Sequence, residues 1–341
     1  MPASSEAGMN FHESERGASP LHPEMHPSAA LKKPRPNLIF RLRKQWQIQA
    51  MALFGIMFVL VFNYAPMFGI IIAFKMADYS VNLMRSITEA PWVGWDYFKE
   101  FILDYQFRDI LLNTVGLNLL QLLINFPAPI IFAILISEIA HKRFKKLVQS
   151  ISYFPHFISW IVFGGIIINM LSVETGVVVS ALLKLGIISE PVSLLGEPNA
   201  FWPLIIITSI IKGLGWGSII YLAAITSIDP TLYEAATIDG AGRFRRIWHI
   251  TLPSISGTII VFFLLSVSNL LNSSFDQLWV FQTPLNLERS EVIDTFVYKI
   301  GITQMRYSYT TAVGLFKSAV ALILLAGGHL ISKKVAGRGI F

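Results

Sequence analysis

The sequence predicts an all-α integral membrane protein that crosses the bilayer six times. Hydrophobic residues make up 54% of the 341 residues, and the mean hydropathy is +0.58. These values arise from several apolar runs of about 20 residues, which is the length a helix needs to cross a bilayer. The six predicted spans are residues 46–74, 110–136, 151–171, 201–228, 254–271 and 310–332.

The first three predicted spans contain prolines or begin near one. Pro66 and Gly69 are expected to kink or break the first span, which a membrane helix tolerates when its neighbours satisfy the freed backbone groups. Pro127 lies inside the second span. A short basic loop, residues 141–146, is expected to lead to the third span, which begins near Pro155.

The second half of the chain continues with the same pattern. The apolar piece 177–188 is too short to cross a bilayer, so we expect an interfacial or re-entrant helix there. Gly213, Gly215 and Gly217 resemble a nucleotide-binding loop only superficially, because they lie inside an apolar span. Close helix packing explains them better. The fifth span is expected to start afresh at Pro253.

The ends of the chain differ in composition from the predicted transmembrane domain, residues 46–332. Residues 1–45 form a basic tail rich in Ser, Pro, Glu and His with no periodic apolar pattern, so we expect disorder. Residues 333–341 form a second short tail. The chain contains no cysteine, which excludes disulfides, Cys-ligated zinc and thiol catalysis. We expect no metal site.

The charges predict the orientation of the chain in the plasma membrane. With six spans, both tails lie on one side, together with the basic residues 142–146 and Arg243, Arg245 and Arg246. Acidic residues outnumber cations in the loops on the other side. The positive-inside rule therefore places both termini in the cytoplasm. The net charge of +6 is explained by these flanking cations, and we expect no nucleic-acid partner.

A polar stretch, residues 229–253, separates the fourth and fifth spans. Asp229 can cap a helix that starts at Pro230. The run Gly240-Ala241-Gly242 indicates a turn, and a second helix can follow from Arg243. The residues thus predict a helix–turn–helix at the membrane surface, and an ordinary amphipathic connector fits them equally well.

The spacing of residues in this stretch resembles the EAA motif of ABC importer permeases, in which EAA and a later glycine precede I-x-L-P. All seven fixed positions match: Glu234, Ala235, Ala236, Gly240, Ile250, Leu252 and Pro253. Further stretches resemble the oligosaccharide permeases of the aldouronate, or LplB-like, branch. These are residues 63–75, 154–160, 292–295 and 311–318.

This resemblance implies a maltose-type permease fold and a transport function. The loop 229–253 would be a cytoplasmic coupling helix that docks on a partner ATPase dimer, which binds ATP and Mg²⁺. The other implied partners are a second related permease, which forms a heterodimer with this chain, and an extracytoplasmic solute-binding protein. The implied substrate is an oligosaccharide that enters the cell, with a uronate-containing sugar as one candidate. No cofactor is expected in this chain.

Two other classes of protein also fit a polytopic membrane chain. One is an embedded enzyme that acts on lipid-linked substrates, and the other is a passive channel or scaffold. Neither requires the EAA-like loop, which distinguishes them from a permease. The sequence contains no G-x-x-x-x-G-K-[ST] phosphate loop, so we do not expect this chain to hydrolyse ATP.

Polar residues inside spans are costly unless they face a cavity or a partner, and they are our candidates for a substrate path. Thr114 and three amides are spaced to share one helical face, as are three residues near the end of the fifth span. Hydrogen bonding between helices, worth about 0.6 kcal/mol in membranes, is the alternative role. The substrate-path candidates are Asn118, Gln121, Asn125, Asn269, Asn272 and Asp276.

Overall fold

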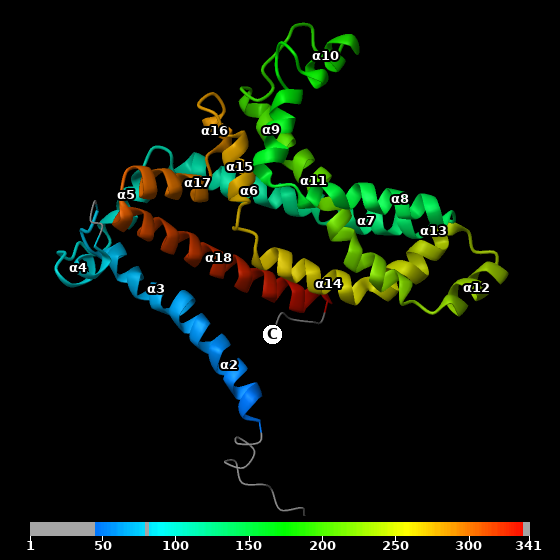
Figure 1. Ribbon diagram of the computed structural model, residues 1–341, viewed down its shortest axis with the longest axis horizontal. Helices are drawn as coiled ribbons and strands as arrows, with labels where there is room; N and C mark the ends of the chain where they lie inside the picture. Colours follow the sequence, from blue (N-terminus) through cyan, green and yellow to red (C-terminus); the bar gives the residue numbers. More distant parts are fainter. Residues whose placement is uncertain (1–44, 79–81, 337–341) are drawn as a thin grey trace, which may run out of the picture. The chain divides into compact units, whose positions relative to one another are not determined.

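Long helices dominate the computed structural model, which describes residues 45–78 and 82–336 (Figure 1). The described residues form no strand, and their only β-type contact is a bridge between Lys75 and Trp92. The chain divides into two compact units at residues 62 and 63. The predicted N-terminal tail, residues 1–45, lies outside the described residues except for its last residue, and the last five residues of the chain also lie outside them.

Helix α2 (Trp46–Val59) and the start of the segment that follows it are the described parts of the first unit. The sequence of α2 is apolar on every side, with Leu, Ile, Phe and Met throughout, as expected of a helix that contacts lipid all round. The helical stretch continues as η1 (Leu60–Tyr64), α3 (Ala65–Met67) and η2 (Phe68–Phe74). Pro66 thus lies in the short α3 between the π and 3₁₀ segments and Gly69 lies in the 3₁₀ segment, and the chain stays helical through both.

Among the described residues, five helices are long and apolar enough to cross a membrane, and a sharply bent pair would make a sixth. After the first span they are α6 (Phe107–Asn125) with α7 (Pro127–Ser137), α11 (Pro198–Thr226), α13 (Arg243–Arg246) to α14 (Leu252–Ser268), and α18 (Tyr307–Ala336). The fifth helix does not restart at Pro253. It runs on from Arg243 through a π turn, η4 (Ile247–Thr251).

The third predicted span is wrong as a single straight helix. Helices α8 (Lys142–Tyr153) and α9 (Trp160–Met170), with the short η3 (Phe154–Phe157) between them, are bent by 104°. Pro155 favours the end of α8, and Ser159 caps the start of α9 by accepting from the Val162 backbone N–H. The predicted basic loop is also wrong, because its cations form the first turns of α8.

Helix α11 is the centre of the second unit and contacts α6, α7, α8 and α14. A Cβ on Gly215 would collide with the Ser152 carbonyl oxygen of α8, and one on Gly217 would lie 3.1 Å from Pro129. These two glycines therefore permit close helix packing, as predicted. No atom lies within 4 Å of a Cβ added at Gly213, so packing does not require a glycine there.

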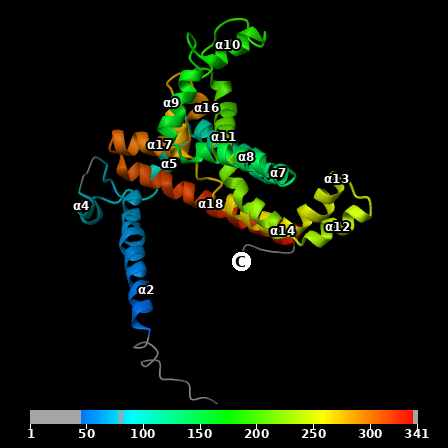
Figure 2. The same ribbon diagram turned by 45° about the vertical axis from the view of Figure 1, so that its right-hand side comes forward.

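Short helices fill the connections. They are α4 (Leu83–Thr88), α5 (Asp96–Leu103), α10 (Val177–Lys184), α12 (Pro230–Ile238), α15 (Phe275–Phe281), α16 (Leu287–Ser290), α17 (Ile293–Tyr298) and η5 (Lys299–Thr303). Within the second unit, α12 and α13 lie at one end and α5 and α17 at the other (Figures 1 and 2). The fold thus separates the EAA-like loop from the connection between the fifth and sixth spans.

Candidate functional site

Helix α12 begins and ends at the residues that the sequence predicts. The Asp229 carboxylate accepts a hydrogen bond of 2.9 Å from the Thr231 backbone N–H and so caps the helix. This bond holds the pKa of Asp229 below its ordinary value, because it stabilises the charged carboxylate. Pro230 occupies the first turn, where its missing N–H costs nothing.

Gly240 ends α12 in a Schellman motif. Its φ is +73°, and its N–H donates to the Thr237 carbonyl, while the Ala241 N–H donates to the Ala236 carbonyl at 2.8 Å. Arg246 reaches back to the Thr237 hydroxyl at 3.1 Å. The turn therefore fixes how α13 leaves α12.

The seven motif residues are exposed or half-buried, and none of them is fully buried. Glu234, Ala235 and Gly240 are exposed, and no salt bridge of the described chain includes Glu234. Leu252 packs against the core formed by α7, α11 and α14. The remaining motif residues show intermediate or full exposure: Ala236 and Ile250 are half-buried, and Pro253 is exposed.

Large exposed apolar side chains occur close in sequence to the exposed motif residues. Ile238 is 88% exposed and Phe244 is 89% exposed, with Trp248 and Leu232 also exposed nearby in the sequence. Arginines at positions 243 and 245 lie beside them, also exposed. Several exposed apolar residues together with exposed arginines in one short stretch are typical of a protein-binding segment. We call Leu232, Glu234, Ile238, Phe244 and Trp248 the α12 surface.

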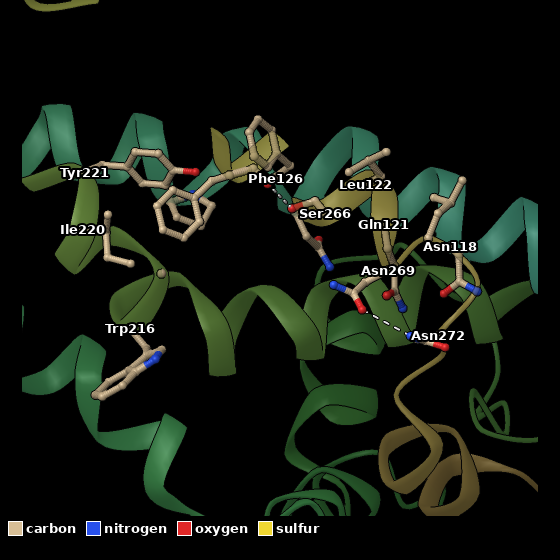
Figure 3. Close-up of a pocket in the computed structure, with 15 residues that line it drawn as sticks. Asn118, Gln121, Leu122, Phe126, Trp216, Ile220, Tyr221, Ser266, Asn269 and Asn272 are labelled. Atoms are coloured by element: carbon tan, nitrogen blue, oxygen red, sulfur yellow. Dashed lines mark hydrogen bonds between the residues drawn. The ribbon is translucent and has the colours of Figure 1, made fainter. Parts of the chain in front are cut away.

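A separate cavity of about 500 Å³ lies among α6, α11 and α14. It contains five of the six predicted substrate-path residues. Figure 3 shows four of their amide side chains together and the rings of Phe126, Tyr221 and Trp216 farther along. The five predicted residues that line the cavity are Asn118, Gln121, Asn125, Asn269 and Asn272.

Some polar atoms of the cavity amides are hydrogen-bonded within the described chain, and others have no partner there. The Asn118 amide donates to the Thr114 carbonyl and to the Ser273 hydroxyl, at 2.7 and 3.0 Å. Asn272 donates to the Asn269 side chain at 3.2 Å. The Asn125 side-chain oxygen, Oδ1, is buried and has no partner within the described chain. Amides and rings of this kind can bind the hydroxyls and the apolar faces of a sugar.

Two parts of the substrate-path prediction need correction. Helix α14 ends at Ser268, so Asn269, Asn272 and Asp276 do not share a helical face. Asp276 instead lies exposed in the first turn of α15 and does not line the cavity. Thr114 is fully buried, and its hydroxyl accepts from the Ile293 N–H, which is a structural role.

The sequence did not predict the contacts of two lysines that lie in apolar spans. Lys317 forms an ion pair of 2.5 Å with Asp294 in a second cavity of about 560 Å³, which shares Asn272 with the first. Lys212 of α11 donates to the Pro155, His156 and Ile158 carbonyls at the bend between α8 and α9. A lysine inside an apolar run was the available signal.

The chain belongs to the family of binding-protein-dependent transport system inner membrane components, whose family description matches residues 106–337. It is therefore a membrane-embedded transport subunit and not an enzyme. The described residues include no group of three or more His, Cys, Asp or Glu side chains that could hold a metal ion.

Particular relatives are similar over most of their length. Protein LplB of Bacillus subtilis is 45% identical over 84% of this chain and 88% of its own. The polygalacturonan/rhamnogalacturonan transport system permease protein YteP of the same organism is 40% identical, over 91% of this chain and 95% of its own. The crystal structure of a bacterial alginate ABC transporter, in complex with a periplasmic protein bound to alginate pentasaccharide, contains a chain that is 36% identical. The match has a TM-score of 0.80 and covers 89% of this chain and 99% of that chain.

Proposed function

We propose that this chain is a permease subunit of an ATP-driven importer that moves an acidic, uronate-containing oligosaccharide into the cell. The observation that carries the proposal is the amide-lined cavity between α6, α11 and α14, which offers hydrogen-bonding groups and rings inside a transport subunit. Support for the substrate class comes from the relatives, because YteP is named for polygalacturonan and rhamnogalacturonan and the structural relative belongs to an alginate ABC transporter.

The α12 surface would serve as the docking site for the ATPase. Its exposed apolar side chains need a partner, and the Glu234 carboxylate can take a charge-assisted hydrogen bond from a cation of that partner. The small Ala235 and Ala236 allow a partner surface to approach the helix backbone. In this proposal residues 46–332 form the permease domain, with residues 229–253 as its coupling loop.

The proposed complex has four kinds of component. This chain pairs with a second related permease, and an ATPase dimer binds ATP and Mg²⁺ on the cytoplasmic side, where both termini lie. A solute-binding protein delivers the oligosaccharide from outside. The cation-rich loops support this orientation through the positive-inside rule.

Transport by the whole complex in lipid vesicles tests the proposal. The complex is assembled with the binding protein outside and ATP inside, and uptake of a labelled uronate oligosaccharide is compared with uptake of a neutral one of equal length. We expect uptake of the acidic sugar that depends on ATP and on the binding protein, with stimulated ATP hydrolysis. Flux without ATP would favour the passive channel, and preferred uptake of the neutral sugar would overturn the substrate class.

A further inference from the structure

Three aromatic rings form a cluster in the connection between the fifth and sixth spans. The Phe275 and Trp279 rings of α15 stack with centroids 5.6 Å apart. Tyr298 of α17 contacts both, at 5.1 Å from Phe275 and 4.9 Å from Trp279. Trp279 remains 38% exposed, so this cluster is not closed off inside the protein.

A third cavity, of about 320 Å³, lies beside Trp279. Its wall includes Gln282, Thr283 and Lys299. The Gln282 Oε1 and Thr283 Oγ1 atoms are buried and have no hydrogen-bond partner within the described chain. Lys299 is paired with Glu291 at 2.5 Å, and its ammonium lies 5.9 Å from the Trp279 ring centre. A native protein rarely leaves two neighbouring polar atoms unpaired unless a ligand or water completes them.

The aromatic cluster connects this cavity with the two described above. Phe275 and Tyr298 line the second cavity, and Trp279 lines the third. The second cavity shares Asn272 with the first, where the amides gather. Adjoining rings and one shared lining residue therefore link the three cavities in the order Trp279, Phe275 and Tyr298, Asn272.

We propose that Trp279, Gln282 and Thr283 form an outer subsite for one sugar ring of the transported oligosaccharide, at the start of an aromatic track into the chain. The subsite rests on the proposed function, because it needs a sugar as substrate. The ring of Trp279 takes the apolar C–H face of the sugar. The two unpaired oxygens accept from its hydroxyls, and Lys299 donates to a hydroxyl or carboxylate.

The chemistry of the wall favours a sugar over a protein side chain as the occupant. A sugar ring presents an apolar face and a rim of hydroxyl donors together, which matches a wall that carries one exposed indole and two residues with unpaired acceptors. The volume lies near the lower end of the range for small-molecule sites, about 300–1,000 Å³. Tyr298 and Phe275 then offer the next ring surfaces toward Asn272.

The test compares Trp279→Leu with Trp279→Phe in the complete transport complex. We expect Trp279→Leu to raise the KM for oligosaccharide uptake about three- to tenfold, the size of effect that one aromatic contact supplies, and Trp279→Phe to retain most of the affinity. Basal ATP hydrolysis and the binding-protein concentration for half-maximal stimulation should stay unchanged. The matched control is Trp92→Leu, because Trp92 is exposed beneath a lysine and lines none of the three cavities.

Thr283→Val separates ligand binding from structure. A purely structural threonine with an unpaired hydroxyl predicts unchanged KM and unchanged or higher thermal stability when that hydroxyl is removed. The proposal predicts a raised KM at unchanged stability. Unchanged KM in both Trp279→Leu and Thr283→Val overturns the subsite, as does a shift confined to the binding-protein concentration, which would make Trp279 a protein contact. The unmodified complex runs in the same assay, so a failure of the transport function itself is seen separately.

Discussion

Substituting Gly240 tests whether the turn after α12 sets the coupling geometry. Its φ of +73° lies in the left-handed region, where a residue with a Cβ costs about 1–2 kcal/mol. No atom lies within 4 Å of an added Cβ, so the backbone alone would carry the strain. We expect Gly240→Val to disfavour the observed turn by that amount, roughly tenfold in population. Gly240→Asn should cost less, because asparagine enters this region more readily.

A changed turn would alter the direction in which α13 leaves α12. The Gly240 and Ala241 N–H groups then lose their carbonyl partners, and Arg246 loses its contact with Thr237. ATP hydrolysis stimulated by the loaded binding protein is measured in vesicles together with uptake. Both should be highest in the unmodified protein, lower in Gly240→Asn and lowest in Gly240→Val. Folding and membrane insertion of this chain should be unaffected, since the turn is exposed and a Cβ added at Gly240 meets nothing in the described part of the chain.

Gly242 provides the matched control two residues away. Its φ of −67° and ψ of 168° suit any residue, and an added Cβ again meets nothing within 4 Å. Gly242→Ala should therefore couple normally. Normal coupling in Gly240→Val, or an equal loss in Gly242→Ala, would refute the reasoning.

The remaining predictions concern orientation, charge and the cavity. Single cysteines introduced into this cysteine-free chain should be labelled from the cytoplasm at positions 145, 242 and 334, and from outside at positions 96, 197 and 288; external labelling at 242 would remove the α12 surface from reach of an ATPase. Glu234→Lys should abolish stimulated hydrolysis and uptake, because it sets a cation against a partner cation, while Glu234→Gln should retain part of both; equal activity of the two variants would count against a charged contact. Asn118→Leu, Gln121→Leu and Asn269→Leu should each lower uptake with assembly and basal hydrolysis intact. Unchanged kinetics in all three would leave these amides with a structural role alone.

Local sequence signals predicted the parts of the fold that depend on neighbouring residues. Helix α12 begins at Asp229 and Pro230 and ends at Gly240, as expected. These signals are local, because helix capping and left-handed turns need only a few adjacent residues. The long helices follow from apolar length in the same way. The break at Ser159 was missed because residues 151–171 are almost uniformly apolar, and a helix interruption leaves that composition unchanged.

The candidate site was predictable only where one helix carries it. Asn118, Gln121 and Asn125 share a face of α6 and do line one cavity. Asp276 was misplaced because the helical period was extended beyond Ser268, where α14 ends. The pair of Asp294 with Lys317, and the cluster of Trp279 with Tyr298, join residues of different elements. No spacing rule reveals such tertiary partners.

Lys212 ties the middle of α11 to the bend between α8 and α9. The helix has 29 residues, or about 43 Å at 1.5 Å per residue, and it leads through three residues into α12. Lys212, near its middle, holds the three carbonyls that set the direction of α9. A displacement of α12 would therefore be passed to α11, a helix that is hydrogen-bonded to the α8–α9 bend at its middle. Movement of α11 would then change the angle between α8 and α9, because Lys212 bonds to the residues at their bend.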